Sequence, residues 1–143
     1  MEENYINYIE FLSEDEIRNL LENDKRSFIG VIPKNIDGKK KLMLAYYEKL
    51  NLAPYFGGNW DALNEVLHDF DWMNAENIII IHCDMPLLPT KDRKMLIDVL
   101  GYAVKIMREG PRPNFQIPTG KHKLRVIFPQ TCRKEIEDLL SAQ

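Results

Sequence analysis

The sequence predicts an α/β fold: a small three-stranded parallel sheet, in strand order 1-2-3, flanked by helices. Short apolar segments rich in β-branched residues alternate along the chain with segments of helical periodicity. The middle apolar segment, residues 77–82 (NIIIIH), is a continuous apolar run, which is typical of a strand buried on both faces. The chain has 143 residues, enough for one domain with its own core. Right-handed crossovers between the strands would place the helices on the sheet faces.

The first part of the chain is expected to hold two helices and the first strand. Ser13 and Glu16 have the spacing of a capping box, so a helix is predicted to begin after Ser13. Residues 27–32 (SFIGVI) are short, apolar and β-branched, as suits a strand. Residues 39–50 have apolar side chains at helical spacing and are predicted to form the second helix. A proline and two adjacent glycines then predict a loop over residues 51–58.

The rest of the chain continues the alternation of helices and strands. Thr90 is a suitable cap for a long helix, and Gly110, followed by two prolines, is a suitable stop for it. The predicted elements are a helix over 60–68, a strand over 77–82, a helix over 91–109, a loop over 111–123, a strand over 124–128 and a final helix over 131–143. The most apolar strand, 77–82, is placed in the centre of the three.

Acidic residues are concentrated in the middle of the chain. Residues 50–90 contain six acids and no lysine or arginine. The other residues together carry a net charge of +3, since the whole chain carries −3. An acidic surface attracts a basic partner and repels phosphate backbones. We therefore expect a basic protein partner and no direct binding of nucleic acid; the alternative is an acidic face that only water contacts.

The sequence also indicates a cytoplasmic location. No apolar run approaches the roughly 20 residues that span a bilayer, and the acidic N-terminus does not resemble a secretory signal. Cys83 and Cys132 are far apart and neither belongs to a CxxC pair, which indicates thiols in a reducing compartment. We expect no membrane association and no cofactor.

Residues 60–68 are predicted to form an amphipathic helix with an acidic outer face. Asn59 is a favourable N-cap residue. The side chains that follow i, i+3, i+4, i+7 spacing, and so form the expected buried stripe, are Leu63, Val66, Leu67 and Phe70. Asp61, Glu65 and His68 follow the same spacing on another side and are expected to face solvent. Like charges four residues apart cost roughly 0.2–0.5 kcal/mol, which an exposed helix can tolerate. The acids suggest a protein interface only together with the aromatic side chains beside them, Tyr55, Phe56 and Trp60.

Residues 52–67 read LAPYFGGNWDALNEVL. This segment resembles the signature of the barstar family, small proteins that inhibit ribonucleases. The signature is an aromatic pair, glycine, a variable residue, asparagine, a hydrophobic residue, Asp-Ala-Leu and a second acid four residues after the first. The matching residues are Tyr55, Phe56, Gly57, Asn59, Trp60, Asp61, Ala62, Leu63 and Glu65. The resemblance implies one domain over residues 1–143, with a barstar-like core at about 27–128 and the terminal helices and the 111–123 loop as additions.

The resemblance implies a non-enzymatic inhibitor, an immunity protein or antitoxin directed at a basic ribonuclease. Barstar-like inhibitors place this loop and helix in the ribonuclease active site, with acidic side chains where substrate phosphates would lie. The implied contact residues are Tyr55, Phe56, Gly57, Asn59, Trp60, Asp61, Asn64, Glu65 and His68. Among them, Asp61 and Glu65 would pair with active-site cations. Trp60 and Tyr55 would be apolar anchors.

Several positions differ from the best-known pattern of the family. Glu65 stands where that pattern has aspartate, and Asn64 and His68 stand where it has tryptophan and threonine. Alignment on the Glu-Gly pair at 109–110 puts Lys105 where a late helix of the family supplies a third acid. The surface that contacts the partner is therefore expected to differ from the familiar one.

Two other interpretations of the acidic helix stay open. The first keeps the fold and changes the partner, to give a general interaction module or an immunity protein for a different toxin. The second is a small enzyme in which Asp61, Glu65 and His68 bind a metal ion, or in which the two acids share acid–base chemistry. An HExxH motif, which would favour the enzyme, is absent from the sequence.

Overall fold

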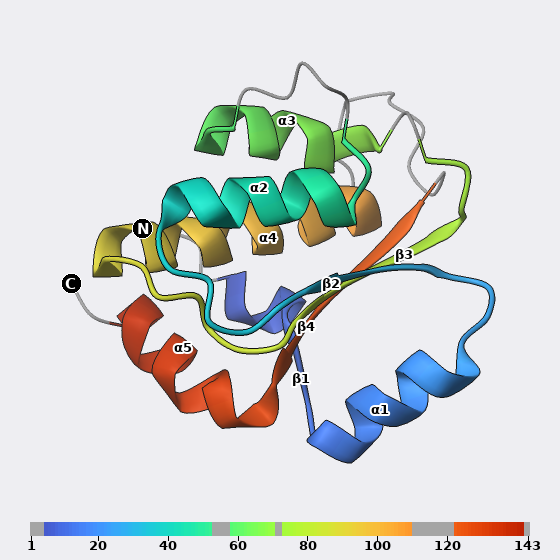
Figure 1. The fold of residues 1–143 in the computed structure, drawn as a ribbon, viewed down its shortest axis with the longest axis horizontal. Helices are drawn as coiled ribbons and strands as arrows, with labels where there is room; N and C mark the ends of the chain where they lie inside the picture. Colours follow the sequence, from blue (N-terminus) through green and yellow to red (C-terminus); the bar gives the residue numbers. More distant parts are fainter. Residues whose placement is uncertain (1–4, 53–57, 71–72, 110–121, 142–143) are drawn as a thin grey trace.

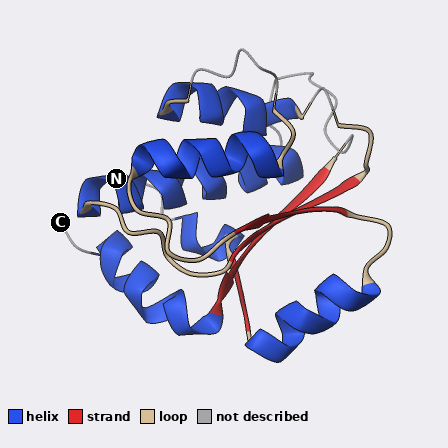
Figure 2. Ribbon diagram, in the orientation of Figure 1, coloured by secondary structure: helices blue, strands red, loops and turns tan. Residues whose placement is uncertain are grey.

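The computed structural model describes residues 5–52, 58–70, 73–109 and 122–141. One sheet of four parallel strands runs through the molecule, with helices on both of its faces (Figures 1 and 2). In chain order the elements are η1 (Tyr5–Tyr8), β1 (Glu10–Leu12), α1 (Glu14–Asn23), β2 (Phe28–Ile32), α2 (Lys39–Lys49), α3 (Trp60–Asp69), β3 (Asn77–His82), α4 (Thr90–Glu109), β4 (Lys123–Pro129), η2 (Gln130–Cys132) and α5 (Arg133–Ser141), where η denotes a 3-10 helix.

The prediction of a three-stranded sheet in order 1-2-3 is wrong. The sheet has four strands in the order β1-β4-β3-β2, and every neighbouring pair is parallel. The additional strand, β1, is only three residues long and pairs with the end of β4, from Glu10 opposite Ile127 to Leu12 opposite Pro129. Three residues are too few to show a strand periodicity, so tertiary pairing alone reveals this strand. The three predicted strands keep their relative order, with β3 between β2 and β4.

Most other elements begin and end close to where the sequence predicts. The capping box before α1 is confirmed: the Ser13 hydroxyl accepts from the Glu16 N–H at 3.1 Å, and the Glu16 carboxylate accepts from the Ser13 N–H at 2.8 Å. Thr90, predicted as the cap of α4, is already its first helical residue. The final helix is divided into η2 and α5. The predicted 51–58 and 111–123 loops lie largely outside the described residues.

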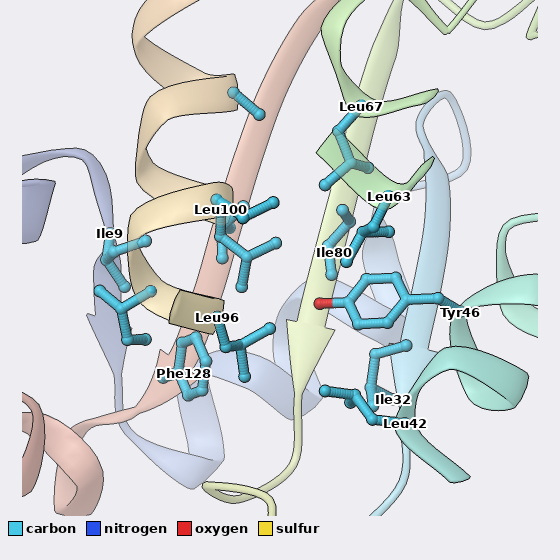
Figure 3. Close-up of a cluster of buried hydrophobic side chains, with 14 of the residues drawn as sticks. Ile9, Ile32, Leu42, Tyr46, Leu63, Leu67, Ile80, Leu96, Leu100 and Phe128 are labelled. Atoms are coloured by element: carbon cyan, nitrogen blue, oxygen red, sulfur yellow. The ribbon is translucent and has the colours of Figure 1, made fainter. Parts of the chain in front are cut away.

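The main core lies between the sheet and the helices α2, α3 and α4 (Figures 1 and 3). Fully buried side chains from all these elements meet there, among them Leu42, Leu63, Leu67, Ile80, Leu96, Leu100 and Phe128. Ile9, and Ile136 and Leu139 of α5, belong to the same cluster, so segments near both ends of the chain share this core. Within the described ranges, no helix is long and apolar enough to cross a membrane.

The opposite face of the sheet carries a smaller apolar cluster. It consists of Ile79, Ile81 and Ile127, against which Ile17 and Leu20 of α1 pack. No residue of α1 is fully buried, whereas α2, α4 and α5 each contribute several buried side chains. The two faces of the sheet therefore bury unequal numbers of apolar side chains. The helix α3, which carries the candidate site, packs on the face with the larger core.

Candidate functional site

The helix α3 is fixed at both of its ends. At its start, the side-chain oxygen of Asn59 accepts a hydrogen bond from the Ala62 N–H at 2.8 Å, which confirms Asn59 as the N-cap. At its end, Phe70 adopts a left-handed conformation, with φ of 52°, and its N–H donates to the Val66 carbonyl. This conformation is uncommon for a residue with a side chain, but burial of the Phe70 ring offsets its cost.

The buried stripe of α3 determines which side of the helix faces outward. Leu63, Leu67 and Phe70 are fully buried in the main core, as predicted, and Val66 is half-buried against it. Burial of an apolar side chain of this size contributes about 1.5–3 kcal/mol to the stability of the fold. Rotation of α3 about its axis would expose several of these side chains and lose their contributions together. The remaining side chains of α3 are therefore held in defined directions.

Asp61 and Glu65 are both exposed on the surface of α3. Within the described ranges, neither carboxylate has a hydrogen-bonding or ion-pair partner from another side chain. Asp61 lies in the first turn, where the positive end of the helix dipole favours a carboxylate. Glu65 is one turn further along and gains less from that dipole. The helix thus presents two adjacent negative charges to solvent.

Trp60 is attached to the neighbouring helix α4. Its ring is half-buried against the main core, and its Nε1–H donates to the Asp92 carboxylate at 3.3 Å. Asp92 lies in the first turn of α4, so this hydrogen bond joins the beginnings of the two helices. The predicted role of Trp60 as an anchor for a partner stays a prediction, but only part of its ring is available for that role.

The expectation that His68 faces solvent is wrong. His68 is half-buried, its Nε2 hydrogen-bonds to the side-chain oxygen of Asn64 at 3.1 Å, and its ring meets the Tyr102 ring edge to face at 5.5 Å. Tyr102 lies on α4, which packs along α3. Helical spacing predicts which residues share a side of α3, but it does not reveal that α4 covers part of that side. His68 therefore connects α3 to α4, and Asn64 holds the His68 ring from within α3.

The loop that precedes α3 lies mostly outside the described residues. Tyr55, Phe56 and Gly57, all predicted contact residues, belong to that part, so their roles stay predictions. Gly58 is described and has φ of 70°, a backbone conformation that favours glycine. A Cβ atom at Gly58 would meet nothing within 4 Å, so the backbone conformation, and not lack of space, explains this glycine.

A groove between α3 and α4 contains residues that the sequence did not single out. It has a volume of about 300 Å³ and is lined by Tyr5, Trp60, Asp61, Asn64, Met95, Asp98, Val99 and Tyr102. The α4 residues among them recur at helical spacing on one side of that helix, which was the only signal available in the sequence. Lys105, one turn beyond Tyr102, is half-buried and does not line the groove.

The metal-binding alternative finds no support in this geometry. Among the residues that the structure describes, no group of three or more His, Cys, Asp and Glu side chains could hold a metal ion, and these residues include Asp61, Glu65 and His68. Cys83 and Cys132 line a separate cleft at the carboxyl ends of the strands. Burial raises the pKa of both thiols, so they stay protonated at neutral pH.

Comparison with known proteins identifies one family. The family model described as Barstar (barnase inhibitor) matches residues 27–117. This match contains β2, α2, α3, β3 and α4, and it leaves η1, β1, α1, β4, η2 and α5 outside. No curated protein matches the chain.

Proposed function

Because this chain belongs to the barstar family, we propose that it inhibits a basic ribonuclease by covering the active site with α3 and the preceding loop. The family is described as inhibitors of a ribonuclease, barnase, which supports a protein partner of this class. The proposal makes the protein a binding partner and not an enzyme.

The exposed carboxylates of Asp61 and Glu65 carry this proposal. A ribonuclease active site holds a polyanion and therefore gathers cationic side chains. Two carboxylates at a fixed separation on a rigid helix complement such a cleft and exclude RNA from it. Because Leu63 and Leu67 fix α3 to the core, the acids are already ordered before binding, which reduces the entropic cost of association.

The biological role follows from the proposed target. A ribonuclease inhibitor protects cellular RNA when it shares a compartment with that RNA. We therefore infer an immunity or antitoxin role in the cytoplasm, where the two thiols would also stay reduced.

A charge-removal variant tests the proposal. The double substitution Asp61→Asn, Glu65→Gln keeps the size of both side chains and removes both charges. Hydrogen bonds to charged groups contribute about 1.5–3 kcal/mol each, so the inhibition constant should rise by a factor of about 100 or more. The measurement is a titration of small basic ribonucleases with wild-type and variant protein, with cleavage of a fluorogenic RNA as the readout.

The matched control changes the same net charge on another helix. Glu137 and Asp138 are exposed on α5, which lies away from α3 (Figure 1). Their ion pairs with Arg133 and Lys134 are on the surface and contribute little to stability. The double variant Glu137→Gln, Asp138→Asn should inhibit like wild type. The proposal fails if no ribonuclease is inhibited at micromolar concentrations, or if both double variants inhibit equally well.

A second candidate function is an immunity protein for a toxin that is not a ribonuclease. It is favoured by Asn64 and His68, which bind each other at the α3–α4 junction, where the best-known family pattern has tryptophan and threonine. Affinity capture with wild-type protein, elution at high salt and mass spectrometry would identify the partner. Capture of a basic toxin without ribonuclease activity, lost in the Asp61→Asn, Glu65→Gln variant, would favour this candidate.

A further inference from the structure

The groove between α3 and α4 combines acidic and aromatic side chains. Asp61 and Asp98 supply carboxylates from the two helices, and Trp60, Tyr102 and Tyr5 supply aromatic rings. Among the described residues that line it, none is a lysine or an arginine. A volume of about 300 Å³ is enough for one side chain of another protein. With carboxylates and aromatic rings in its lining, the groove is suited to bind a planar cationic group.

The aromatic rings of the groove are held by contacts within the molecule. The rings of Tyr5 and Tyr102 meet edge to face, with centroids 5.9 Å apart, and Tyr102 makes a second such contact with His68 at 5.5 Å. Trp60 is held by its hydrogen bond to Asp92. Aromatic side chains fixed in this way lose little entropy when a ligand binds between them.

The N-terminal segment reaches this groove because Gly101 of α4 lets it approach closely. A Cβ atom at Gly101 would lie 2.3 Å from the Cβ of Tyr5, a separation that real atoms do not adopt. Further along, the Tyr8 hydroxyl donates to the Glu109 carboxylate at 2.7 Å, and the Arg108 guanidinium lies over the Tyr8 ring at 5.2 Å. These contacts attach η1 to α4 along two turns.

Tyr5 lies outside the part of the chain that the family model matches. That match begins at residue 27, so α3 and α4 belong to the matched region and η1 does not. The N-terminal segment thus adds an aromatic wall to a groove whose other walls are family elements. Asp61 belongs both to this groove and to the exposed acidic face of α3, so the two surfaces are continuous.

We propose that this groove receives an arginine side chain of the partner protein, and that η1 is therefore part of the partner-binding surface. This inference rests on the proposed function. Arginine fits better than lysine because its planar guanidinium stacks on aromatic rings while it pairs with a carboxylate. Tyr5 and Tyr102 are then residues that determine which partners bind, in addition to the acids of α3.

The preference of the groove for an arginine side chain over an uncharged side chain of the same shape can be measured without a ribonuclease. In a Trp72→Phe background, Trp60 is the single tryptophan, and its emission reports on the groove. We expect a saturable change in emission with N-acetyl-arginine amide and none with N-acetyl-citrulline amide, which has the same shape without the charge. The change should be lost in Asp61→Asn and in Tyr5→Ala. An equal response to both amides, or no response to either, would overturn the inference.

Inhibition assays then test the role of η1. Tyr5→Ala should raise the inhibition constant roughly tenfold, since an aromatic–cation contact of this kind is modest in strength. Gly101→Ala should act in the same direction because it displaces Tyr5 and leaves the other lining side chains in place. Leu44→Ala is the control: it removes a large exposed side chain from α2, outside the groove, so inhibition should be unchanged.

The two proposals fail in distinguishable ways. If folded Tyr5→Ala inhibits like wild type while the Asp61→Asn, Glu65→Gln variant does not, η1 is not part of the surface and the proposed function stands. If no ribonuclease is inhibited but Trp60 still distinguishes arginine amide from citrulline amide, the proposed target is wrong and the preference of the groove stands. Circular dichroism and urea unfolding of each variant separate loss of contact from loss of folding.

Discussion

At the scale of single residues, His82 shows how burial sets a charge state. The side chain is fully buried at the end of β3, its ring stacks on Phe128 at 4.6 Å, and its Nε2 hydrogen-bonds to the Tyr46 hydroxyl. Within the described residues its Nδ1 has no partner. Burial lowers the pKa of His82 to about 3, so the ring is neutral in the folded protein at neutral pH.

This lowered pKa predicts a loss of stability in mild acid. In the unfolded chain His82 takes up a proton near its ordinary pKa of 6.5, whereas in the folded protein it does so only near pH 3. Its contribution to stability is therefore complete above pH 6.5 and is lost as the pH falls toward 3, by up to about 1.4 kcal/mol per pH unit.

Urea unfolding of wild type and His82→Gln between about pH 7 and about pH 4 measures this effect. The difference in the free energy of unfolding between the two proteins should shrink as the pH falls, because the glutamine does not titrate. The comparison also removes the contribution of the carboxylates, which are present in both proteins. A difference that stays constant over this range would contradict the assignment of a lowered pKa to His82.

At the scale of elements, α3 depends on its surroundings for its rigidity. A helix of ten residues is marginal in water by itself. Here the Asn59 cap, the buried stripe and the hydrogen bond from Trp60 to Asp92 together hold it. The acids of α3 are thus positioned by contacts on the other sides of the same helix.

Loss of the cap should therefore weaken both stability and binding. Asn59→Ala removes the acceptor for the Ala62 N–H and should lower the free energy of unfolding by about 1 kcal/mol. It should also fray the first turn, which carries Trp60 and Asp61, so amide exchange in α3 should accelerate and inhibition should weaken.

Asn59→Asp is the matched variant for this experiment, because it keeps a capping oxygen. Its amide exchange in α3, followed by NMR, should stay close to that of wild type. If the alanine and aspartate variants exchange at the same rate, the side chain of Asn59 does not stabilise the start of α3 in the way that the structure indicates.

At the scale of the whole molecule, the distribution of charge matters more than its sum. The net charge is only −3, yet residues 50–90 contain six acids and no basic residue. By contrast, the first turn of α2 presents Lys39, Lys40 and Lys41, all of them exposed. A basic partner approaching the molecule would therefore be guided by local potential toward α3 and not by net charge.

The rate of association with a basic ribonuclease should accordingly depend on salt. Between about 50 and about 500 mM salt the association rate constant should fall by roughly tenfold or more, because screening shortens the reach of the surface charges. The dissociation rate constant should change much less. Stopped-flow fluorescence measures both.

The Asp61→Asn, Glu65→Gln variant should show a shallower salt dependence of association than the Glu137→Gln, Asp138→Asn control, although both lose the same net charge. Equal slopes for the two variants would mean that the charge of the whole molecule, and not the surface of α3, guides the encounter.

Short-range interactions explain which features of this fold could be predicted from the sequence. The Ser13 capping box, the strand over 77–82 and the buried stripe of α3 depend on hydrogen bonds and side-chain spacing within a few residues, and all were predicted correctly. The acids of α3 were predicted to be exposed for the same reason, and Asp61 and Glu65 are exposed.

The sequence by itself thus determined the class of the fold, most of its elements and the acidic side of α3, because these follow from local patterns. Only the tertiary structure decided that β1 adds a fourth strand, that His68 turns toward Tyr102, and that Tyr5 joins Trp60 in one groove. Each of these depends on contact between segments far apart in the chain. The periodicity of one segment does not specify which other segment will pack against it.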